Sequence, residues 1–295
     1  MIDVTLTTVG TTLSYVAKAA RWCGGKGLVW KARDRMTISI LQNLHIGVVH
    51  ECRALTSALQ PAPGEVASRI ASGLCDRMND IMRTILELQP NQLHCCIKLI
   101  APKENPTEDD QLGTWARSQP FDDRPVHQEP SKDFHSIDKN TVWCAFYGRN
   151  DGVTNWTRVN CFSCNDLLKQ APLFKCDRDN WQQFYQSVMV FPINFAIGSD
   201  NRSFSRLGFL AFDSPIQNAF RGMPNIFEYR DSISEYRDRL LDSTCFHFGA
   251  ICADLLGAAI ADAFRSTTQP AVLPVVKPTP NHRSHHPNPK KRRRR

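Results

Sequence analysis

The sequence predicts an α+β fold, in which an antiparallel sheet is flanked by N-terminal and C-terminal helices. Apolar residues recur at helical spacing in two segments before residue 90 and in one long segment after residue 230. Between them, short runs of strand-like residues are separated by polar, turn-rich stretches. A hydrophobic fraction of 42% over 295 residues is enough for one large domain or two small ones. Because helices precede and follow the strands, we expect them to pack on one side of a single sheet.

The first two helices are expected at residues 33–60 and 64–88, where Pro61 and Pro90 end the apolar patterns. Residues 1–32 form a separate leader segment with a weak amphipathic stripe, which the glycine-rich residues 24–27 interrupt. We interpret this stripe as a leader helix that packs on the domain. A surface anchor for anionic lipid or for a partner helix is the alternative.

Four strands are predicted, at residues 92–101, 141–149, 186–196 and 206–212. The last two are expected to form a hairpin. Residues 102–140 are predicted to be a long loop, with one regular piece around Leu112 to Arg117. A short helix is expected from Asn165 to Gln170, with Asn165 as its N-cap.

The final helix covers residues 232–264, with an interruption near Asp242, so the folded domain spans residues 33–265. Residues 266–295 are rich in proline and hold eight of the 36 basic residues and none of the 29 acidic ones. Such a composition cannot bury a core and predicts a disordered basic tail. The rest of the chain is close to neutral.

Three strings of residues resemble the strands of GAF domains. Residues 93–100 (Leu-His-Cys-Cys-Ile-Lys-Leu-Ile) stand where the family has its first strand. Residues 185–193 contain the Ser-x-hydrophobic pattern that ends in Pro-Ile, and residues 207–214 contain the Gly-hydrophobic-Leu pattern that ends in Asp. The resemblance covers residues 40–265 and implies a sensory or regulatory module like those of uncharacterised bacterial proteins.

The same resemblance implies a ligand between the sheet and the chain around residues 150–185. The residues expected to contact this ligand are Arg149, Arg158, Asn165, Asp166 and Ser187. The signatures of cyclic-nucleotide and bilin binding are not visible, so the ligand is an unknown small molecule and the cofactor is unspecified. Modules of this kind often pair through their terminal helices, so a homodimer or a protein partner is also expected.

Two local patterns suggest further sites. A helix that begins at Asn165 would expose backbone N–H groups to an anion, with Arg149 and Arg158 nearby. Solvated arginines beside an ordinary helix cap are the simpler interpretation.

Three cysteines, Cys161, Cys164 and Cys176, have half of the ligand spacing that a structural zinc site requires. A second Cys-x2-Cys pair is absent from the sequence, so we favour buried or incidental thiols over a metal site.

No sequence motif indicates catalysis. No nucleophile elbow, phosphate loop, zincin or deaminase motif is present, and we expect a non-catalytic protein. The chain has no secretory signal, and several of its 11 cysteines lie in apolar runs, which favours free thiols in the cytoplasm. No run of 18 apolar residues occurs, so no membrane-spanning helix is expected.

The tail supports a second hypothesis, a polyanion-binding protein that acts through its C-terminus. A cluster of six cations would neutralise about six phosphates of a nucleic acid without reading its sequence. Anionic membrane is an equal candidate, a nuclear import signal is another, and a solubilising tail is the simplest interpretation. The cluster consists of Lys290, Lys291, Arg292, Arg293, Arg294 and Arg295.

Deletion of residues 266–295 tests this hypothesis. We expect the deletion to abolish binding to DNA and to anionic vesicles, because the remaining chain has nearly balanced charge. Fluorescence anisotropy and vesicle co-sedimentation at low salt measure the two interactions. Binding that survives the deletion would refute a role for the tail.

Overall fold

The computed structural model describes residues 48, 50–58, 65–100, 111–119, 134–176, 181–197 and 203–265, all of which belong to one compact unit. The predicted leader, residues 1–32, and the predicted tail, residues 266–295, lie outside the described residues. The described α-helices are α3 (His50–Ala58), α4 (Glu65–Leu86), α5 (Thr141–Tyr147), α6 (Ile233–Leu240) and α7 (Thr244–Arg265). The strands are β1 (His94–Ile100), β2 (Gln111–Arg117), β3 (Phe134–Ser136), β4 (Phe162–Cys164), β5 (Ser187–Ile197) and β6 (Ser203–Ser214).

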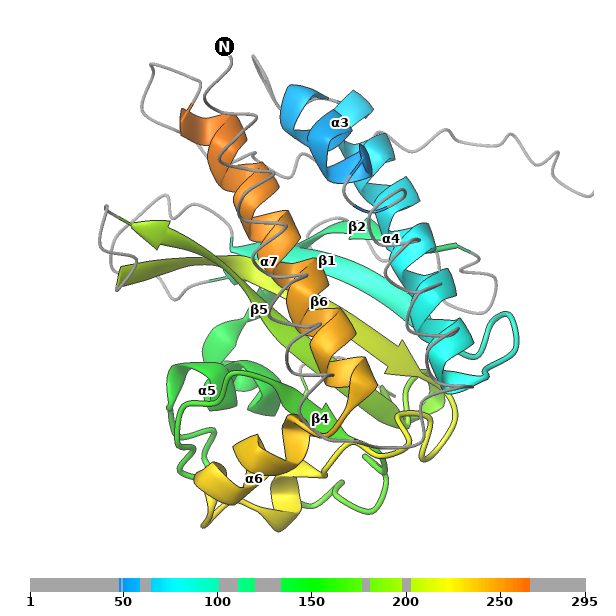
Figure 1. The fold of residues 1–295 in the computed structure, drawn as a ribbon. Helices are drawn as coiled ribbons and strands as arrows, with labels where there is room; N and C mark the ends of the chain where they lie inside the picture. Colours follow the sequence, from blue (N-terminus) through cyan, green and yellow to red (C-terminus); the bar gives the residue numbers. More distant parts are fainter. Residues whose placement is uncertain are drawn as a thin grey trace, which may run out of the picture. The chain divides into compact units, whose positions relative to one another are not determined.

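The described strands form one antiparallel sheet in the order β3-β2-β1-β6-β5-β4 (Figure 1). Its longest pairing is the β5–β6 hairpin, whose register runs from Ser187 opposite Ser214 to Ile197 opposite Ser203. The predicted strands at residues 92–101, 186–196 and 206–212 are confirmed as β1, β5 and β6. The α+β class with an antiparallel sheet and flanking helices is confirmed as well.

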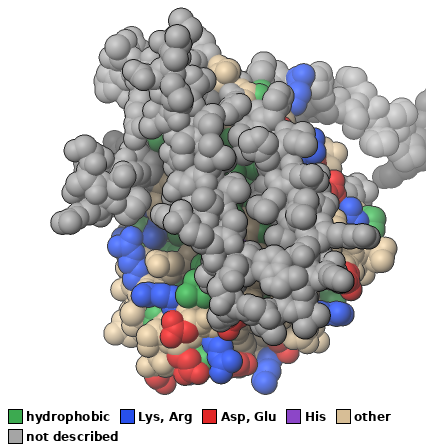
Figure 2. All heavy atoms as spheres, viewed as in Figure 1, with side chains coloured by type: hydrophobic (Ala, Val, Ile, Leu, Met, Phe, Trp, Pro, Cys, Tyr) green, Lys and Arg blue, Asp and Glu red, His purple; other side chains and the backbone are tan. Residues whose placement is uncertain are grey.

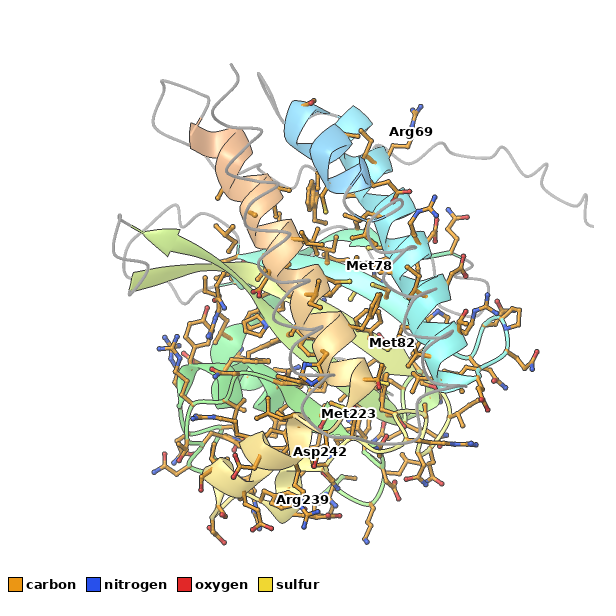
Figure 3. All side chains as sticks on the ribbon, viewed as in Figure 1. Arg69, Met78, Met82, Met223, Arg239 and Asp242 are labelled. Carbon is orange, nitrogen blue, oxygen red and sulfur yellow. The ribbon has the colours of Figure 1, made fainter. Side chains whose placement is uncertain are left out.

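The long helices form a layer on one face of this sheet. Helix α7 packs on β5 and β6, α4 packs on β1 and β2, and α3 contacts both helices (Figure 1). Buried residues on α4 recur at helical spacing, and Met78 and Met82 project from it into this layer (Figure 3). The predicted interruption of the last helix is also confirmed, since α6 ends at Leu240 and α7 begins at Thr244.

Helix α7 is apolar along most of its length. Over Thr244–Ala261 it is long and apolar enough to cross a membrane by composition, but 56% of that window is buried inside the protein. Core helices pass the same test, so this is weak evidence for a membrane span. The packing of α7 on β5 and β6 accounts for its apolar composition.

The prediction of a strand at residues 141–149 is wrong, because Thr141–Tyr147 forms helix α5. The side chain of Asn140 caps the helix by accepting a hydrogen bond from the backbone N–H of Val142, and Gly148 ends it with a φ of 64°. Residues 141–146 are all buried, so neither helical nor strand periodicity is visible in this run. The single-layer expectation is therefore also corrected, since α5 packs on the face opposite α4 and α7.

The shorter elements agree with the prediction only in part. The regular piece predicted around Leu112 to Arg117 is confirmed as strand β2, but residues 134–136 form strand β3 and residues 162–164 form the edge strand β4, neither of which was predicted. The expected helix at residues 165–170 is a series of turns, stabilised by bonds such as Gln170 N–H to Leu167 O and Phe174 N–H to Gln170 O. The side chain that caps these turns is Asp166, which accepts a bond from Lys169 N–H at 3.0 Å, rather than Asn165.

Close contact between α7 and β5 depends on glycine. A Cβ at Gly257 would lie 2.1 Å from the backbone oxygen of Asn194, whereas a Cβ at Gly73 on α4 meets nothing within 4 Å. We expect Gly257→Ala to destabilise the protein by about 1–3 kcal/mol through overpacking. Gly73→Ala should stabilise it by about 0.5–1 kcal/mol, since alanine is the better helix former. Urea unfolding of both variants measures the two effects, and equal signs would contradict the close approach.

Candidate functional site

Helix α5 covers the sheet face opposite α4 and α7. The aromatic rings of Trp143, Phe146 and Tyr147 lie 4.7, 4.9 and 6.4 Å from the ring of Phe209 on β6. Phe191 on β5 contacts α7 and is opposite Leu210 in the hairpin register. Because neighbouring residues of a strand point to opposite faces, Phe209 must face away from α7. The contact between α5 and the sheet is therefore separate from the main helix layer.

The indole of Trp143, on α5, is unusual because it is buried without a hydrogen-bond acceptor among the described residues. Its side chain is only 4% exposed, and its Nε1–H has no hydrogen-bond partner in the described part of the chain. The indole of Trp156 provides a comparison, since its Nε1–H donates to Asp151 Oδ2 at 2.9 Å. A buried donor without an acceptor costs about 1–3 kcal/mol of stability. Such groups therefore usually have a hydrogen-bond acceptor in the functional state of a protein.

Polar side chains gather on the same sheet face as Phe209. On β1, His94, Cys96 and Lys98 alternate with apolar residues, and the register places Lys98 beside Phe209 and His94 beside Asp213. On β2, Cys96 is opposite Arg117, and Lys98 is opposite Thr114. We refer to His94, Cys96, Lys98, Thr114, Arg117 and Asp213 as the polar cluster.

Thr114 links the two cations of this cluster. Its hydroxyl oxygen accepts hydrogen bonds from Lys98 Nζ at 2.9 Å and from Arg117 Nη2 at 3.2 Å. Lys98, Arg117, His94 and Asp213 also take part in further interactions, so the cluster is well partnered rather than a set of free charges.

The thiol of Cys96 is not activated by its charged neighbours. Burial raises the pKa of Cys96, and although Lys98 and Arg117 oppose this effect, Asp213 reinforces it. The thiol therefore stays protonated near neutral pH, which makes it a poor nucleophile.

A loop centred on Asp151 extends from α5. The carboxylate of Asp151 accepts hydrogen bonds from Thr141 Oγ1 at 2.7 Å, from Trp156 Nε1 at 2.9 Å and from the backbone N–H groups of Val153 and Thr154. Lys175 Nζ donates to the Asp151 carbonyl oxygen at 2.7 Å. Asp151 thus ties the start of α5 to the chain that follows the helix.

Two of the residues predicted to bind ligand have structural roles. The side-chain amide of Asn165 bonds to the backbone of Phe220 and Met223. Ser187 Oγ donates to the carbonyl oxygens of Asn165 and Ile216. Both side chains therefore anchor the segment that follows β6.

The other predicted ligand residues divide into two groups. Arg149 and Arg158 lie at the C-terminal end of α5, where the backbone N of Arg158 is close to Gly148. Asp166 is separate from them, since it caps a turn and accepts a bond from Gln217 Nε2 at 3.2 Å. The structure therefore does not place the two arginines at a helix start near Asn165.

The predicted metal ligands have different surroundings. Cys161 and Cys164 are buried, and burial raises the pKa of both thiols, that of Cys164 to about 12. The Cys176 thiol lies 3.4 Å from the hydroxyl of Tyr185. Among the described residues, no group of three or more His, Cys, Asp or Glu side chains is arranged to hold a metal ion.

Sequence reasoning missed Trp143 and the polar cluster. A signal for part of the cluster was present, because His94, Cys96 and Lys98 recur at every second position of a confirmed strand. Their pairing with Thr114 and Arg117 could not be predicted without β2. Trp143 was predicted to lie on a strand, and that prediction gives no reason to expect its contact with Phe209.

The carboxyl group of Asp151 leads to a prediction about stability and pH. Burial alone would raise the pKa of Asp151, but the hydrogen bonds from Trp156, Thr154, Thr141 and Val153 outweigh it and lower the pKa. The stabilisation is therefore present above the unfolded-state pKa of about 3.9 and is lost as pH falls through the lower folded-state pKa. We expect Asp151→Asn to cost about 1–3 kcal/mol at pH 7 and less at pH 3. Urea unfolding at both pH values, with the exposed Asp231→Asn as control, measures this; a cost independent of pH would contradict it.

Comparison with known proteins gives only weak likenesses. No family model matches the sequence, and no curated protein matches it significantly. Two of the solved structures that it resembles are a type II free methionine-R-sulfoxide reductase from Thermoplasma acidophilum and the GAF domain of a phosphoenolpyruvate-protein phosphotransferase from Acinetobacter. Both are 12% identical with a TM-score of 0.34; the first covers 67% of this chain and 95% of its own, the second 74% and 96%. Neither likeness carries an inference, and the GAF-like description rests on the strand strings and the sheet that they form.

Proposed function

We propose that this protein is a non-catalytic, GAF-like regulatory module that binds a small molecule between α5 and the sheet. The observation that carries the proposal is the buried Nε1–H of Trp143, which lacks an acceptor in the described part of the chain. A ligand with an oxygen or nitrogen acceptor would satisfy this donor and remove its desolvation penalty. Phe209, fully buried beneath α5, supplies an apolar surface beside the donor.

The polar cluster supports a ligand with polar groups. Ligand sites are mostly apolar, with a few polar groups that fix orientation. Here Phe209 and the rings of α5 are the apolar part, and Lys98 and Thr114 lie beside Phe209 across the strands. Because Lys98 already donates to Thr114, the cluster is arranged before a ligand arrives.

A non-catalytic role is supported by the state of the thiols. Burial raises the pKa of Cys96 on this face, and it also raises the pKa of Cys144 on α5 to about 11. Neither thiol is therefore present as a thiolate near neutral pH, the form in which cysteine attacks a substrate.

Native mass spectrometry of the full chain tests the proposal. We expect a bound small molecule that denaturation releases, or a compound from a metabolite library that raises the unfolding temperature of the protein. The same spectrum measures whether the predicted homodimer forms. An empty protein whose unfolding temperature no compound raises would contradict ligand binding.

Two tryptophan variants separate the ligand site from its supporting loop. Trp143→Phe removes the indole donor and should weaken ligand binding by about tenfold, as expected for a lost buried hydrogen bond. Trp156→Phe should instead destabilise the fold by about 1–3 kcal/mol more than Trp143→Phe, because Asp151 loses a donor. Thermal unfolding with and without ligand measures both. Unchanged ligand affinity in Trp143→Phe would rule out a contact with Nε1.

A further inference from the structure

Three arginines gather at the C-terminal end of α5. The guanidinium of Arg206 lies 4.9 Å from the centre of the Tyr147 ring, and that of Arg149 lies 5.1 Å from the same ring. The loop after α5 returns to the helix end, where a Cβ on Gly148 would lie 3.3 Å from the backbone N of Arg158. Figure 2 shows basic side chains gathered on the side of the molecule where Figure 1 places α5.

A β-bulge turns Arg206 toward this place. In the β5–β6 pairing, Gly208 is opposite Ile193 and Arg206 is opposite Asn194, so Leu207 is the extra residue. The bulge brings Arg206 to the same face as Phe209, and its guanidinium lies 5.5 Å from the centre of that ring.

The charge of Arg149 is balanced, whereas the charges of the other two arginines are not. Arg149 Nη1 pairs with Asp138 Oδ1 at 2.5 Å. Within the described part of the chain, neither Arg158 nor Arg206 forms an ion pair with an acidic group. Arg206 has neutral partners only, since Nη1 donates to the carbonyl oxygen of Phe146 at 2.9 Å and Nε approaches Asn194 Oδ1 at 3.5 Å.

The C-terminal end of α5 explains the position of Arg206 but not that of Arg158. The carbonyl groups at a helix C-terminus favour a positive charge, and Arg206 occupies that position. Burial lowers the pKa of Arg206, Tyr147 opposes this effect, and the nearby charge of Arg158 reinforces it. Arg158 is exposed, so burial in a core does not fix its side chain at this position. Among the described residues, the group of three guanidinium groups has one carboxylate, that of Asp138, which pairs with Arg149, so an anion is favoured beside the other two.

We propose that Arg158 and Arg206 form an oxyanion site at the C-terminal end of α5 that binds a phosphate group. A guanidinium group can bind phosphate through two parallel hydrogen bonds, and phosphate oxygens that the two arginines leave unused stay available to solvent. The Tyr147 ring holds the guanidinium of Arg206 in place for this contact. The site opens to solvent at Arg158, so it does not depend on the ligand proposed beneath α5.

Titration calorimetry of the full chain with inorganic pyrophosphate tests this site. Arg158→Gln should weaken pyrophosphate binding by about tenfold, because one charge-assisted contact is lost. Arg239→Gln on α6, where an exposed arginine is labelled in Figure 3, removes the same charge elsewhere and should change the affinity less than about twofold. Malonate, a dicarboxylate with the same net charge as hydrogen phosphate, should bind more weakly than inorganic phosphate.

The matched pair also separates this site from the basic tail, which is unchanged in both variants. Equal affinities in Arg158→Gln and Arg239→Gln would overturn the proposal, because binding would then follow net charge or the tail. Arg206→Lys keeps the positive charge but removes the guanidinium group that can donate two parallel hydrogen bonds, so it too should weaken pyrophosphate binding. Thermal unfolding confirms that this variant is folded. Wild-type affinity in folded Arg206→Lys would exclude Arg206 from the site.

Discussion

Strand β6 is the element on which the rest of the structure depends, because it pairs with both β1 and β5 and supplies both faces of the sheet. Leu210 lies on the side of the long helices, and Phe209 lies on the side of α5. The approach of β1 is so close that a Cβ at Gly208 would lie 2.0 Å from the backbone oxygen of Lys98. Glycine is therefore required there by the neighbouring backbone, which gives a physical reason for the glycine in the GAF-like string at residues 207–214.

The two faces of this sheet differ in chemistry. On the side of α4 and α7, the helices bury leucine, methionine and cysteine side chains, and the glycines of α7 permit a close fit. On the side of α5, charged groups from β1, β2 and β6 lie among aromatic rings. Charges on a partly covered sheet face reduce stability unless they are partnered, and here Lys98 and Arg117 share Thr114 as a partner.

The elements with a clear period could be predicted from sequence, and those without one could not. Helix α4 and strands β1, β5 and β6 show helical or alternating patterns over at least seven residues, and each was predicted close to its observed bounds. Helix α5 is only seven residues long and almost wholly buried, so its β-branched and aromatic side chains suggested a strand. Its boundaries were nevertheless present in the sequence, since Asn140 and Gly148 are typical N-cap and C-terminal residues. Strands β3 and β4 have three residues each, which is too short for any periodicity to be seen.

The candidate site could be predicted only in part for a related reason. Arg149 and Arg158 were linked by sequence distance alone, and they lie near each other because the loop between them closes on itself, with Asn150 bridged to Asn155. Their third partner, Arg206, is about fifty residues further along and reaches them only through the bulge at Leu207, a local irregularity that no pattern in the sequence predicts.

Asn165 and Ser187 were predicted to contact a ligand, but the structure gives them another role. Their polar side chains drew attention as ligand contacts, yet backbone groups of a distant segment already use them. A polar residue near an expected site is therefore informative only after its hydrogen bonds are counted, and by that measure the unpartnered indole of Trp143 is the stronger indication of a ligand.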